Sequence, residues 1–345
     1  MRKSLVAQRL VLILIACAGL LSAADLKIVL SAGPRYRWAT TKEALAGYHN
    51  AAPDAKLVIV ESPEVLASEI VDADAVVGDL PRPLFPKAQK LRWLQEYSAG
   101  VEDYGFPEFT SSNVVLTNCK IAQGPTIADH AFGLLLSLTR GINRHIANRE
   151  QEEWNRDGAG LIELQGKTAV ILGVGGIGSQ IAQRAHGFGM KVIGVDPKDV
   201  APSNVISAMV RPDRLDSVLP EADVVFVSAP HTPESERMMG ARQFDLMKKG
   251  SYFVAVSRGK LYDTAALLKA LDTQKLAGAG LDVTDPEPLP KGHPLWKFPN
   301  VVITPHIASQ APGSHARRVA VITENLGRFV RGEPLINVVD KQKGY

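Results

Sequence analysis

The sequence predicts an α/β protein with two domains, each built on a mostly parallel sheet. Short apolar segments alternate with segments of helical periodicity twice along the chain, once between residues 27 and 117 and again between residues 168 and 303. A strand, a helix and a second strand in succession form a crossover, which makes the two strands parallel. Runs such as Leu57–Val60 are continuously apolar, which indicates sheets that are covered on both faces. The 345 residues suffice for two such cores.

The first 24 residues have the pattern of a secretory signal. Three basic residues, Arg2, Lys3 and Arg9, precede an apolar run of 12 residues. Ser22-Ala23-Ala24 then provides the small residues of a cleavage site. The apolar run is too short to span a bilayer comfortably, so we expect export and no stable membrane span after the signal is removed. A lipoprotein attached through Cys17, a retained anchor and a cytoplasmic protein with a mis-assigned start are the alternatives.

The rest of the chain is electrically neutral. The net charge of +3 comes entirely from the three basic residues of the first 24 positions. A neutral body gives no electrostatic reason to expect binding to nucleic acid or to an anionic membrane surface. Cleavage of the signal leaves Cys119 as the only cysteine, so we expect no internal disulfide and a thiol that packs at a strand end. We find no cluster of residues with the spacing of a metal site.

The first alternating series is predicted to form a five-stranded sheet with helices between the strands. The strand segments are 27–32, 57–61, 75–79, 91–97 and 114–117, and helices are expected at 41–50 and 64–71. A long helix is expected over residues 127–154. Its first part, Ala131–Leu136, is apolar nearly all round, and its later part, Arg144–Glu153, is highly charged. That change is typical of a linking or dimer-forming helix.

The second alternating series is predicted to form a doubly wound parallel sheet. Its strand segments are 168–172, 191–195, 223–228, 251–256, 276–281 and 301–303. A helix is expected at Ser314–Arg331, followed by a tail that packs back on the first domain.

A glycine-rich turn follows the first strand of the second series. The turn Gly173-Val174-Gly175-Gly176-Ile177-Gly178 opens a helix, as G-x-G-x-x-G does in dinucleotide-binding (Rossmann) domains. Asp196 ends the next strand, 18 residues beyond Gly178. A carboxylate there accepts hydrogen bonds from the ribose hydroxyls and repels a 2′-phosphate, which favours NAD over NADP. Because the turn lies mid-chain, the L-lactate and malate dehydrogenase architecture is disfavoured.

Three chemically capable side chains follow three neighbouring strands of this series. Arg258, Glu287 and His306 come after the strands at 251–256, 276–281 and 301–303, respectively. The carboxyl ends of parallel strands share one edge of the sheet. An arginine that binds a carboxylate, a histidine that transfers a proton and a carboxylate that orients the histidine are what hydride transfer to a 2-keto acid requires.

Further motifs occur in a characteristic order between residues 90 and 335. They are Ser98-Ala99-Gly100-Val101, Ala128–Gly133, Gly173–Gly178, Pro230–Glu234, Ser257-Arg258-Gly259, Leu281-Asp282-Val283, Glu287-Pro288 and Asn300–His306. With these motifs the chain resembles the D-isomer-specific 2-hydroxyacid dehydrogenase family. His293–Trp296 is similar to the glyoxylate/hydroxypyruvate reductase branch.

The resemblance implies a Rossmann doubly wound cofactor domain, residues 123–308, inserted in a flavodoxin-like α/β substrate domain, residues 25–122 and 309–345. It implies that Arg258 holds the substrate, that His306 is the acid/base and that Glu287 hydrogen-bonds His306. The implied substrate grip comes from Ser98, Ala99 and Gly100. NAD would be held by Gly173, Gly175, Gly176, Ile177, Gly178, Asp196, Pro230 and Asp282, the last at the nicotinamide carboxamide. Family members are usually homodimers.

Two positions depart from the family pattern. Ala255 stands where the family often has asparagine, and His231 stands where it often has leucine. Two other functions stay open. A formate- or phosphite-type dehydrogenase shares the scaffold, but those relatives tend to replace the carboxylate at Glu287 with glutamine. A non-catalytic NAD-binding regulator would keep all three side chains. His130, at the start of the long helix, is expected to be structural.

Overall fold

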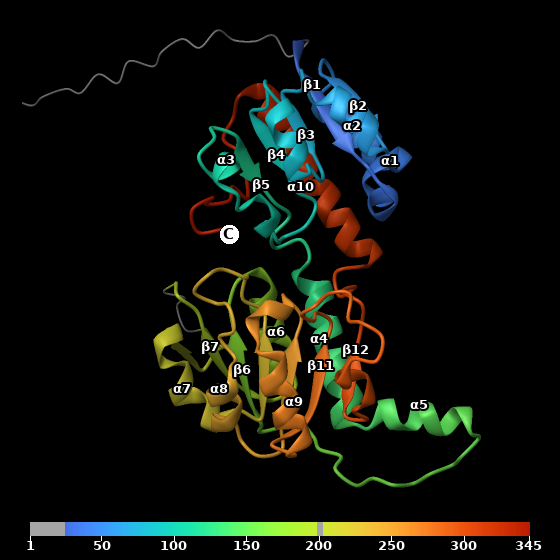
Figure 1. The fold of residues 1–345 in the computed structure, drawn as a ribbon, viewed down its shortest axis with the longest axis vertical. Helices are drawn as coiled ribbons and strands as arrows, with labels where there is room; N and C mark the ends of the chain where they lie inside the picture. Colours follow the sequence, from blue (N-terminus) through green and yellow to red (C-terminus); the bar gives the residue numbers. More distant parts are fainter. Residues whose placement is uncertain (1–24, 199–202) are drawn as a thin grey trace, which may run out of the picture.

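The computed structural model describes residues 25–198 and 203–345. The predicted signal segment, residues 1–24, lies outside the described residues. Figure 1 shows two sheets one above the other, with α4 (Gly124–Thr139) beside the lower sheet and α10 (Pro312–Arg331) beside the upper one. Both sheets are parallel throughout, which confirms the predicted α/β class. Each of the eleven predicted strand segments overlaps an observed strand.

The upper sheet has the strand order β2-β1-β3-β4-β5. Its strands are β1 (Lys27–Ser31), β2 (Lys56–Val60), β3 (Ala75–Val77), β4 (Trp93–Gln95) and β5 (Val115–Thr117), and its helices are α1 (Lys42–Ala51), α2 (Pro63–Glu69), α3 (Pro107–Thr110) and α10. Polar caps start the first two helices, because Thr41 Oγ1 accepts a hydrogen bond from Ala44 N and Ser62 Oγ accepts one from Val65 N.

The C-terminal segment packs on the upper sheet. Ile322 and Leu326 of α10 are fully buried in the same hydrophobic cluster as Trp93. Beyond α10, Val339 N donates a hydrogen bond to Leu116 O at 2.9 Å. The chain passes from one core to the other near the start of α4, since Ala122 belongs to the upper cluster and Ile127 to a cluster of the lower domain.

The lower sheet has the strand order β12-β11-β10-β9-β6-β7-β8. Its strands are β6 (Thr168–Leu172), β7 (Lys191–Val195), β8 (Ala208–Val210), β9 (Val224–Val227), β10 (Ser251–Ala255), β11 (Leu276–Leu281) and β12 (Val301–Ile303). The order reverses between β6 and β9, so the crevice at the carboxyl ends of these two strands is where a doubly wound sheet binds its ligand. Its main covering helices are α4, α6 (Gly176–Gly187), α7 (Leu215–Val218), α8 (Ala241–Leu246) and α9 (Thr264–Asp272).

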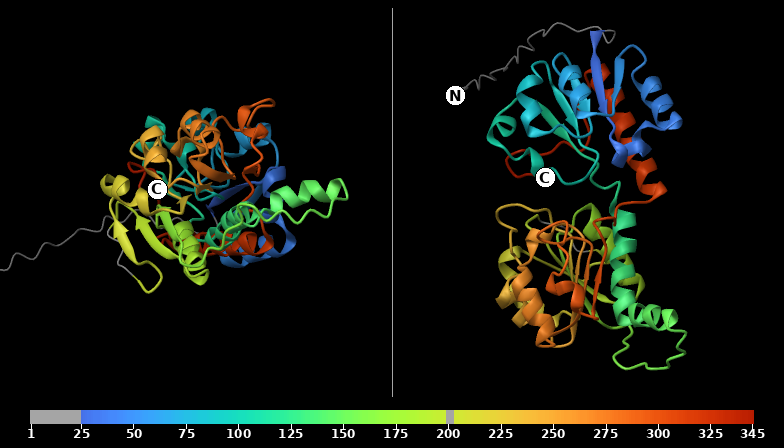
Figure 2. Two further views of the ribbon diagram at one scale, coloured as in Figure 1. Left: turned by 90° about the horizontal axis from the view of Figure 1, so that it is seen from below. Right: turned by 45° about the vertical axis from the view of Figure 1, so that its right-hand side comes forward.

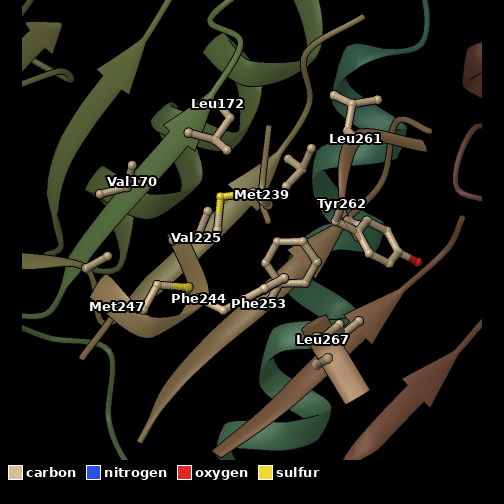
Figure 3. Packing of buried hydrophobic residues seen from close by; sticks show 14 of the residues in the cluster. Val170, Leu172, Val225, Met239, Phe244, Met247, Phe253, Leu261, Tyr262 and Leu267 are labelled. Atoms are coloured by element: carbon tan, nitrogen blue, oxygen red, sulfur yellow. The ribbon is translucent and has the colours of Figure 1, made fainter. Parts of the chain in front are cut away.

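Two apolar layers cover the lower sheet. On one side, Phe244 and Met247 from the region of α8 and Leu267 of α9 pack against sheet residues such as Val225, as Figure 3 shows. On the other side, α4 packs so closely on β11 that a Cβ at Gly280 would lie 2.7 Å from Leu134 Cβ. The lower sheet is therefore covered on both faces, as its apolar strands predict. The same expectation was wrong for Leu57–Val60, because β2 is an edge strand in which only Val60 is buried.

The segment predicted as one helix, residues 127–154, is two helices. α4 ends at Thr139, and α5 (Ile142–Glu150) starts after Gly141. Gly141 has φ 64° and ψ 20°, a left-handed conformation that ends α4 and turns the chain. α5 has no buried residue and extends away from the lower domain (Figures 1 and 2). The long helix was therefore a wrong prediction, because periodicity alone does not register a single glycine that breaks the helix.

The prediction that Cys119 packs at a strand end is confirmed. Cys119 is fully buried at the end of β5, and burial raises the pKa of its thiol to about 12, so it is a packed side chain and a poor nucleophile. Across the described residues, every helix is too short or too polar to cross a membrane. Those same residues contain no group of three or more His, Cys, Asp or Glu side chains arranged to hold a metal ion.

Candidate active site

The glycine turn brings strand, turn and helix into direct backbone contact. Gly173 has φ +85°, and a Cβ there would overlap the backbone of Ala229, which follows β9. A Cβ at Gly178 would overlap the carbonyl oxygen of Gly173 and lie 2.9 Å from Ser228 Oγ. Ser228 Oγ also donates a hydrogen bond to Gly173 O at 2.8 Å. Glycine is therefore required at both positions for α6 to start against β6 and β9.

The two middle glycines of the turn have different surroundings. Gly175 caps the N-terminus of α6, and the space at its Cβ position is open. The first N–H groups of a helix lack intrahelical partners and attract anions, so this space suits a phosphate. At Gly176, by contrast, a Cβ would lie 3.0 Å from Ile121 Cα, so this glycine lets the link between the domains pass close to α6. Ile177 packs partly buried against the apolar core.

Asp196 ties the glycine turn to the end of β7. Its Oδ2 accepts a hydrogen bond from Val174 N at 2.8 Å, and its Oδ1 accepts one from Lys198 N at 2.9 Å. The residue is 9% exposed. A carboxylate is thus held beside the turn, where an adenosine ribose would bind.

The residues around the turn fit a dinucleotide. Besides the open space at Gly175, the buried Ser257 Oγ, after β10, has no hydrogen-bond partner among the described residues. The buried His231 Nε2, after Pro230, has no hydrogen bond there either, and its contact with Glu236 Oε2 is long, at 3.6 Å. Buried polar atoms are normally satisfied by protein, water or ligand. A polar ligand that runs from the glycine turn along this edge would satisfy them.

Asp282, at the end of β11, organises the segment after β12. Its Oδ1 accepts hydrogen bonds from Thr304 Oγ1 at 2.6 Å and from Ile307 N at 3.0 Å, and its Oδ2 accepts one from Ala308 N at 3.0 Å. Behind it, His130 Nε2 lies 2.8 Å from Thr304 Oγ1 and 3.4 Å from Asp282 Oδ1. Burial raises the pKa of Asp282, but the hydrogen bonds outweigh burial and leave the pKa below its ordinary value.

His306 and Glu287 form a hydrogen-bonded pair next to this network. His306 Nδ1 lies 2.6 Å from Glu287 Oε1. An ionised carboxylate only accepts hydrogen bonds, so Nδ1 carries the hydrogen and Nε2 is left as the atom that exchanges a proton with a ligand. The side chains of His306 and Glu287 are 31% and 40% exposed, which leaves the ring accessible.

Arg258, which follows β10, reaches the upper domain. Its Nη1 donates a hydrogen bond to Ser257 O at 2.7 Å, and its Nε pairs with Glu102 Oε1 in η4 (Glu102–Tyr104). The guanidinium lies directly over Gly100, where a Cβ would overlap Arg258 Nη2. Burial raises the pKa of Glu102, but the charge of Arg258 and its hydrogen bond outweigh burial and lower the pKa overall. This contact joins the two domains at the candidate site.

The loop Ser98–Gly100 is held in place from the upper domain. Ser98 Oγ donates to Gly100 O at 2.6 Å, and Asn118 Nδ2 donates to Ala99 O at 2.7 Å. Ser98 N donates to Glu96 Oε1 at 3.0 Å. Burial, and secondly the charge of a neighbouring carboxylate, raise the pKa of Glu96 to about 7. The loop therefore faces Arg258 in a fixed conformation.

Comparison with known proteins assigns the chain to a family. The model of the D-isomer specific 2-hydroxyacid dehydrogenase NAD binding domain matches residues 132–308. The chain belongs to the D-isomer specific 2-hydroxyacid dehydrogenase family. A glyoxylate reductase from Korarchaeum cryptofilum is 34% identical over 302 residues, which are 84% of this chain and 88% of the relative.

Two further comparisons agree on this 2-hydroxyacid dehydrogenase family. A D-3-phosphoglycerate dehydrogenase from Methanocaldococcus jannaschii is 34% identical over 80% of this chain, and the match spans only 53% of that relative's length. The crystal structure of a D-isomer specific 2-hydroxyacid dehydrogenase family protein from Aeromonas salmonicida superposes with a TM-score of 0.81 at 30% identity. It covers 92% of this chain and 99% of its own.

Most of the site residues that were predicted from the sequence of this family member lie at one edge of the lower sheet. Arg258, Glu287 and His306 follow β10, β11 and β12, which are neighbours in the sheet. Asp282 binds the segment that carries His306, and Ser98–Gly100 meets Arg258 from the other domain. Asp282 already accepts three hydrogen bonds from protein, so its contact with a nicotinamide carboxamide stays a prediction.

The structure adds two carboxylates that sequence reasoning missed. Glu102 pairs with Arg258 although 156 residues separate them, and Glu96 holds Ser98. Both follow β4, and Glu102 lies directly after the Ser98–Val101 motif. That proximity was the only available signal. His130 takes a structural place, as predicted, but its partners are Thr304 and Asp282, inside the site.

Proposed function

We propose that this protein reduces a small 2-keto acid to the D-2-hydroxy acid with NADH, or runs the reverse reaction with NAD. The single observation that carries the proposal is the arrangement of Arg258 and the His306–Glu287 pair on neighbouring strand ends beside a dinucleotide-type glycine turn. Family membership supports the same chemistry.

In the proposed reaction Arg258 binds the substrate carboxylate. A guanidinium offers parallel N–H groups that match a carboxylate, and Nη2 of Arg258 faces the Ser98–Gly100 loop, whose backbone would complete the grip. His306 donates its proton to the carbonyl oxygen in reduction and accepts the proton in oxidation. Glu287 keeps the imidazole oriented and stabilises its protonated form.

The cofactor would be held by the glycine turn and Asp196. When bound, the nicotinamide supplies or accepts the hydride. The start of α6 at Gly175–Gly178 would bind the pyrophosphate, and Asp196 would bind the ribose. The proposed preference for NAD rests on Asp196, because its carboxylate would repel the 2′-phosphate of NADP and is fixed by hydrogen bonds from two backbone N–H groups.

Three further properties belong to the proposal. The substrate is expected in the glyoxylate/hydroxypyruvate class, in line with the glyoxylate reductase relatives and with His293–Trp296. A homodimer is proposed through the α5 segment, which exposes Ile142, Ile146 and Trp154. Export is proposed from the signal pattern of residues 1–24.

The deciding experiment measures consumption of NADH and NADPH, side by side, with glyoxylate, hydroxypyruvate, pyruvate and longer 2-keto acids. We expect turnover with NADH and much less with NADPH. Arg258→Ala should abolish turnover and still bind NADH, since Arg258 follows β10, and β9 separates β10 from β6, which leads into the glycine turn. If NADH binds but no keto acid is reduced, a non-catalytic NAD-binding function replaces the proposed one.

A further inference from the structure

We propose that Glu102 is a positioning residue for Arg258 that also selects against substrates carrying a second negative charge. This inference rests on the proposed function, because it assigns a substrate class to the same site. The Ser98–Val101 motif ends just before Glu102, and the candidate acid, base and cofactor residues do not include it. Its carboxylate nonetheless contacts the guanidinium that would bind the substrate.

Two of the three guanidinium nitrogens of Arg258 donate hydrogen bonds to the protein, and we assign the third to the substrate. Glu102 accepts from Nε, and Ser257 O accepts from Nη1 at 2.7 Å. Nη2 lies over Gly100, at the loop proposed to grip the substrate carboxylate, and Glu102 Oε2 lies 2.7 Å from the position that a Cβ of Gly100 would take. With two nitrogens fixed from opposite domains, the planar guanidinium has one orientation, and Nη2 is the atom directed to the loop. Glu102 therefore prepares Arg258 for a carboxylate.

The same contact places a negative charge beside the ligand. The side chains of Arg258 and Glu102 are 29% and 34% exposed, so neither is sealed away from the space between the domains. The charge of Arg258 and its hydrogen bond more than offset the effect of burial on the pKa of Glu102, which is lowered overall. Glu102 is thus ionised at neutral pH and already neutralises part of the charge of Arg258.

This arrangement discriminates between keto acids by their charge. A monoanion brings one carboxylate to Nη2 and the loop. A dianion brings a second carboxylate into a site where the ionised Glu102 already pairs with the guanidinium of Arg258. Like charges about 6 Å apart at a partly exposed site change an equilibrium constant roughly tenfold. The site therefore binds keto acids with a neutral side chain in preference to those with a second carboxylate.

The test compares pyruvate with oxaloacetate, which differs from pyruvate by one side-chain carboxylate. Glu102→Gln keeps a hydrogen-bond acceptor for Arg258 and removes the charge. We expect its kcat/KM for oxaloacetate relative to pyruvate to rise roughly tenfold above the wild-type ratio. Asp103→Asn is the matched control. It removes the neighbouring carboxylate, which has no contact with Arg258 among the described residues, and it should leave the ratio unchanged.

The Glu102→Ala variant tests whether Glu102 positions Arg258 for the substrate or competes with the substrate for Arg258. Loss of both the acceptor and the charge should raise KM for pyruvate several-fold with little change in kcat, and Glu102→Gln should restore much of that KM. Unaltered NADH affinity and melting temperature establish that the variants are folded. The proposal is overturned if Glu102→Ala lowers KM for pyruvate, which would make Glu102 a competitor of the substrate. An unchanged oxaloacetate-to-pyruvate ratio in Glu102→Gln overturns it equally.

A second measurement separates this inference from the proposed function. Calorimetric binding of pyruvate and of oxaloacetate to the NAD-loaded protein gives the same affinity ratio without turnover. Absence of turnover in the wild type would refute the dehydrogenase function alone. A binding ratio that does not respond to Glu102→Gln would refute the role of Glu102 alone.

Discussion

His306 holds a left-handed backbone conformation, with φ 54°, that a side chain other than glycine adopts at a cost of the order of 1 kcal/mol. The hydrogen bonds of Asp282 sustain it. His306 N donates to the carbonyl oxygen of Asp282 at 2.8 Å, and the next two backbone N–H groups donate to its carboxylate. The conformation turns the imidazole toward Glu287. Asp282 is thereby a residue that positions His306, whatever else it binds.

Glu287→Gln should lower kcat/KM by roughly ten- to a hundredfold with little change in KM. The amide oxygen can still accept the hydrogen bond from His306 Nδ1, but it no longer stabilises a protonated imidazole. Steady-state kinetics with a 2-keto acid and NADH check this, with Asp285→Asn, an exposed carboxylate in the same loop, as the control. A wild-type value of kcat in Glu287→Gln would contradict the role given to Glu287.

The buried carboxyl of Glu96 predicts a fall in stability as pH rises. Burial, and secondly the charge of Asp79, raise its pKa from 4.5 to about 7 in the folded protein. Between these values the unfolded chain has lost the proton and the folded chain still holds it, so the free energy of unfolding decreases through this window. The full effect, of the order of 3 kcal/mol at most, is reached above pH 7.

Glu96→Gln should remove this dependence, because glutamine is neutral throughout and can accept the hydrogen bond from Ser98 N. The variant should match the wild type near pH 4.5 and exceed it in stability near pH 8. Denaturant unfolding at several pH values measures the difference. A stability difference that stays constant across the window would show that Glu96 does not titrate there.

The sequence was sufficient for groups that stand at strand ends. Arg258, Glu287 and His306 were found because parallel strands deliver their carboxyl ends to one edge. Glu102 and Glu96 were missed because the only local signal is that they lie near the Ser98–Val101 motif, and that signal does not show their partners. The role of Glu102 depends on a partner 156 residues away, and that of Glu96 depends on its burial. Such roles arise from the packing of the domains and leave no motif in the chain.

At the level of elements, strands and helices were predicted correctly where the local pattern of apolar residues is strong. Strands with long apolar runs, such as β6, were predicted with their observed bounds. β8 was missed because it is a three-residue edge strand, half exposed, that pairs only with β7. Pairing on one side demands little apolar surface, so its sequence carries little periodic pattern. The break at Gly141 was missed because α4 and α5 both have helical composition.

The junction of β6 and α6 allows a sharp test with two glycines of one helix. Gly178→Ala would force a Cβ against the carbonyl oxygen of Gly173, which is backbone and cannot move aside. We expect a loss of about 1–3 kcal/mol in stability and a marked loss of NADH affinity. Gly187→Ala, at an exposed position of α6 with open space at the Cβ, should change stability by less than about 1 kcal/mol. Equal behaviour of the two variants in NADH titrations and thermal melts would count against the packed turn.

At the scale of the whole molecule, α5 is the element with no apparent function within one chain. It has no buried residue, and it leads into a segment that leaves the lower domain (Figure 2). Ile142 and Ile146 are one helical turn apart and 48% and 49% exposed, and Trp154 is 88% exposed. Three large apolar side chains on one projecting segment are costly to leave in water, which is the reason for the homodimer proposed above.

Ile146→Glu should therefore convert a dimer into a monomer. A charge placed in an apolar contact would have to lose its hydration without gaining a partner, which costs several kcal/mol and outweighs what one isoleucine contributes. Val65→Glu is the matched control, because Val65 is 47% exposed on α2 in the other domain. Light scattering coupled to size exclusion should give a dimer for the wild type and for Val65→Glu, and a monomer for Ile146→Glu with NADH binding retained. Since the glycine turn and Arg258 lie within one chain, the monomer should keep its cofactor affinity. A wild-type monomer, or a dimer that survives Ile146→Glu, would mean that α5 has another role.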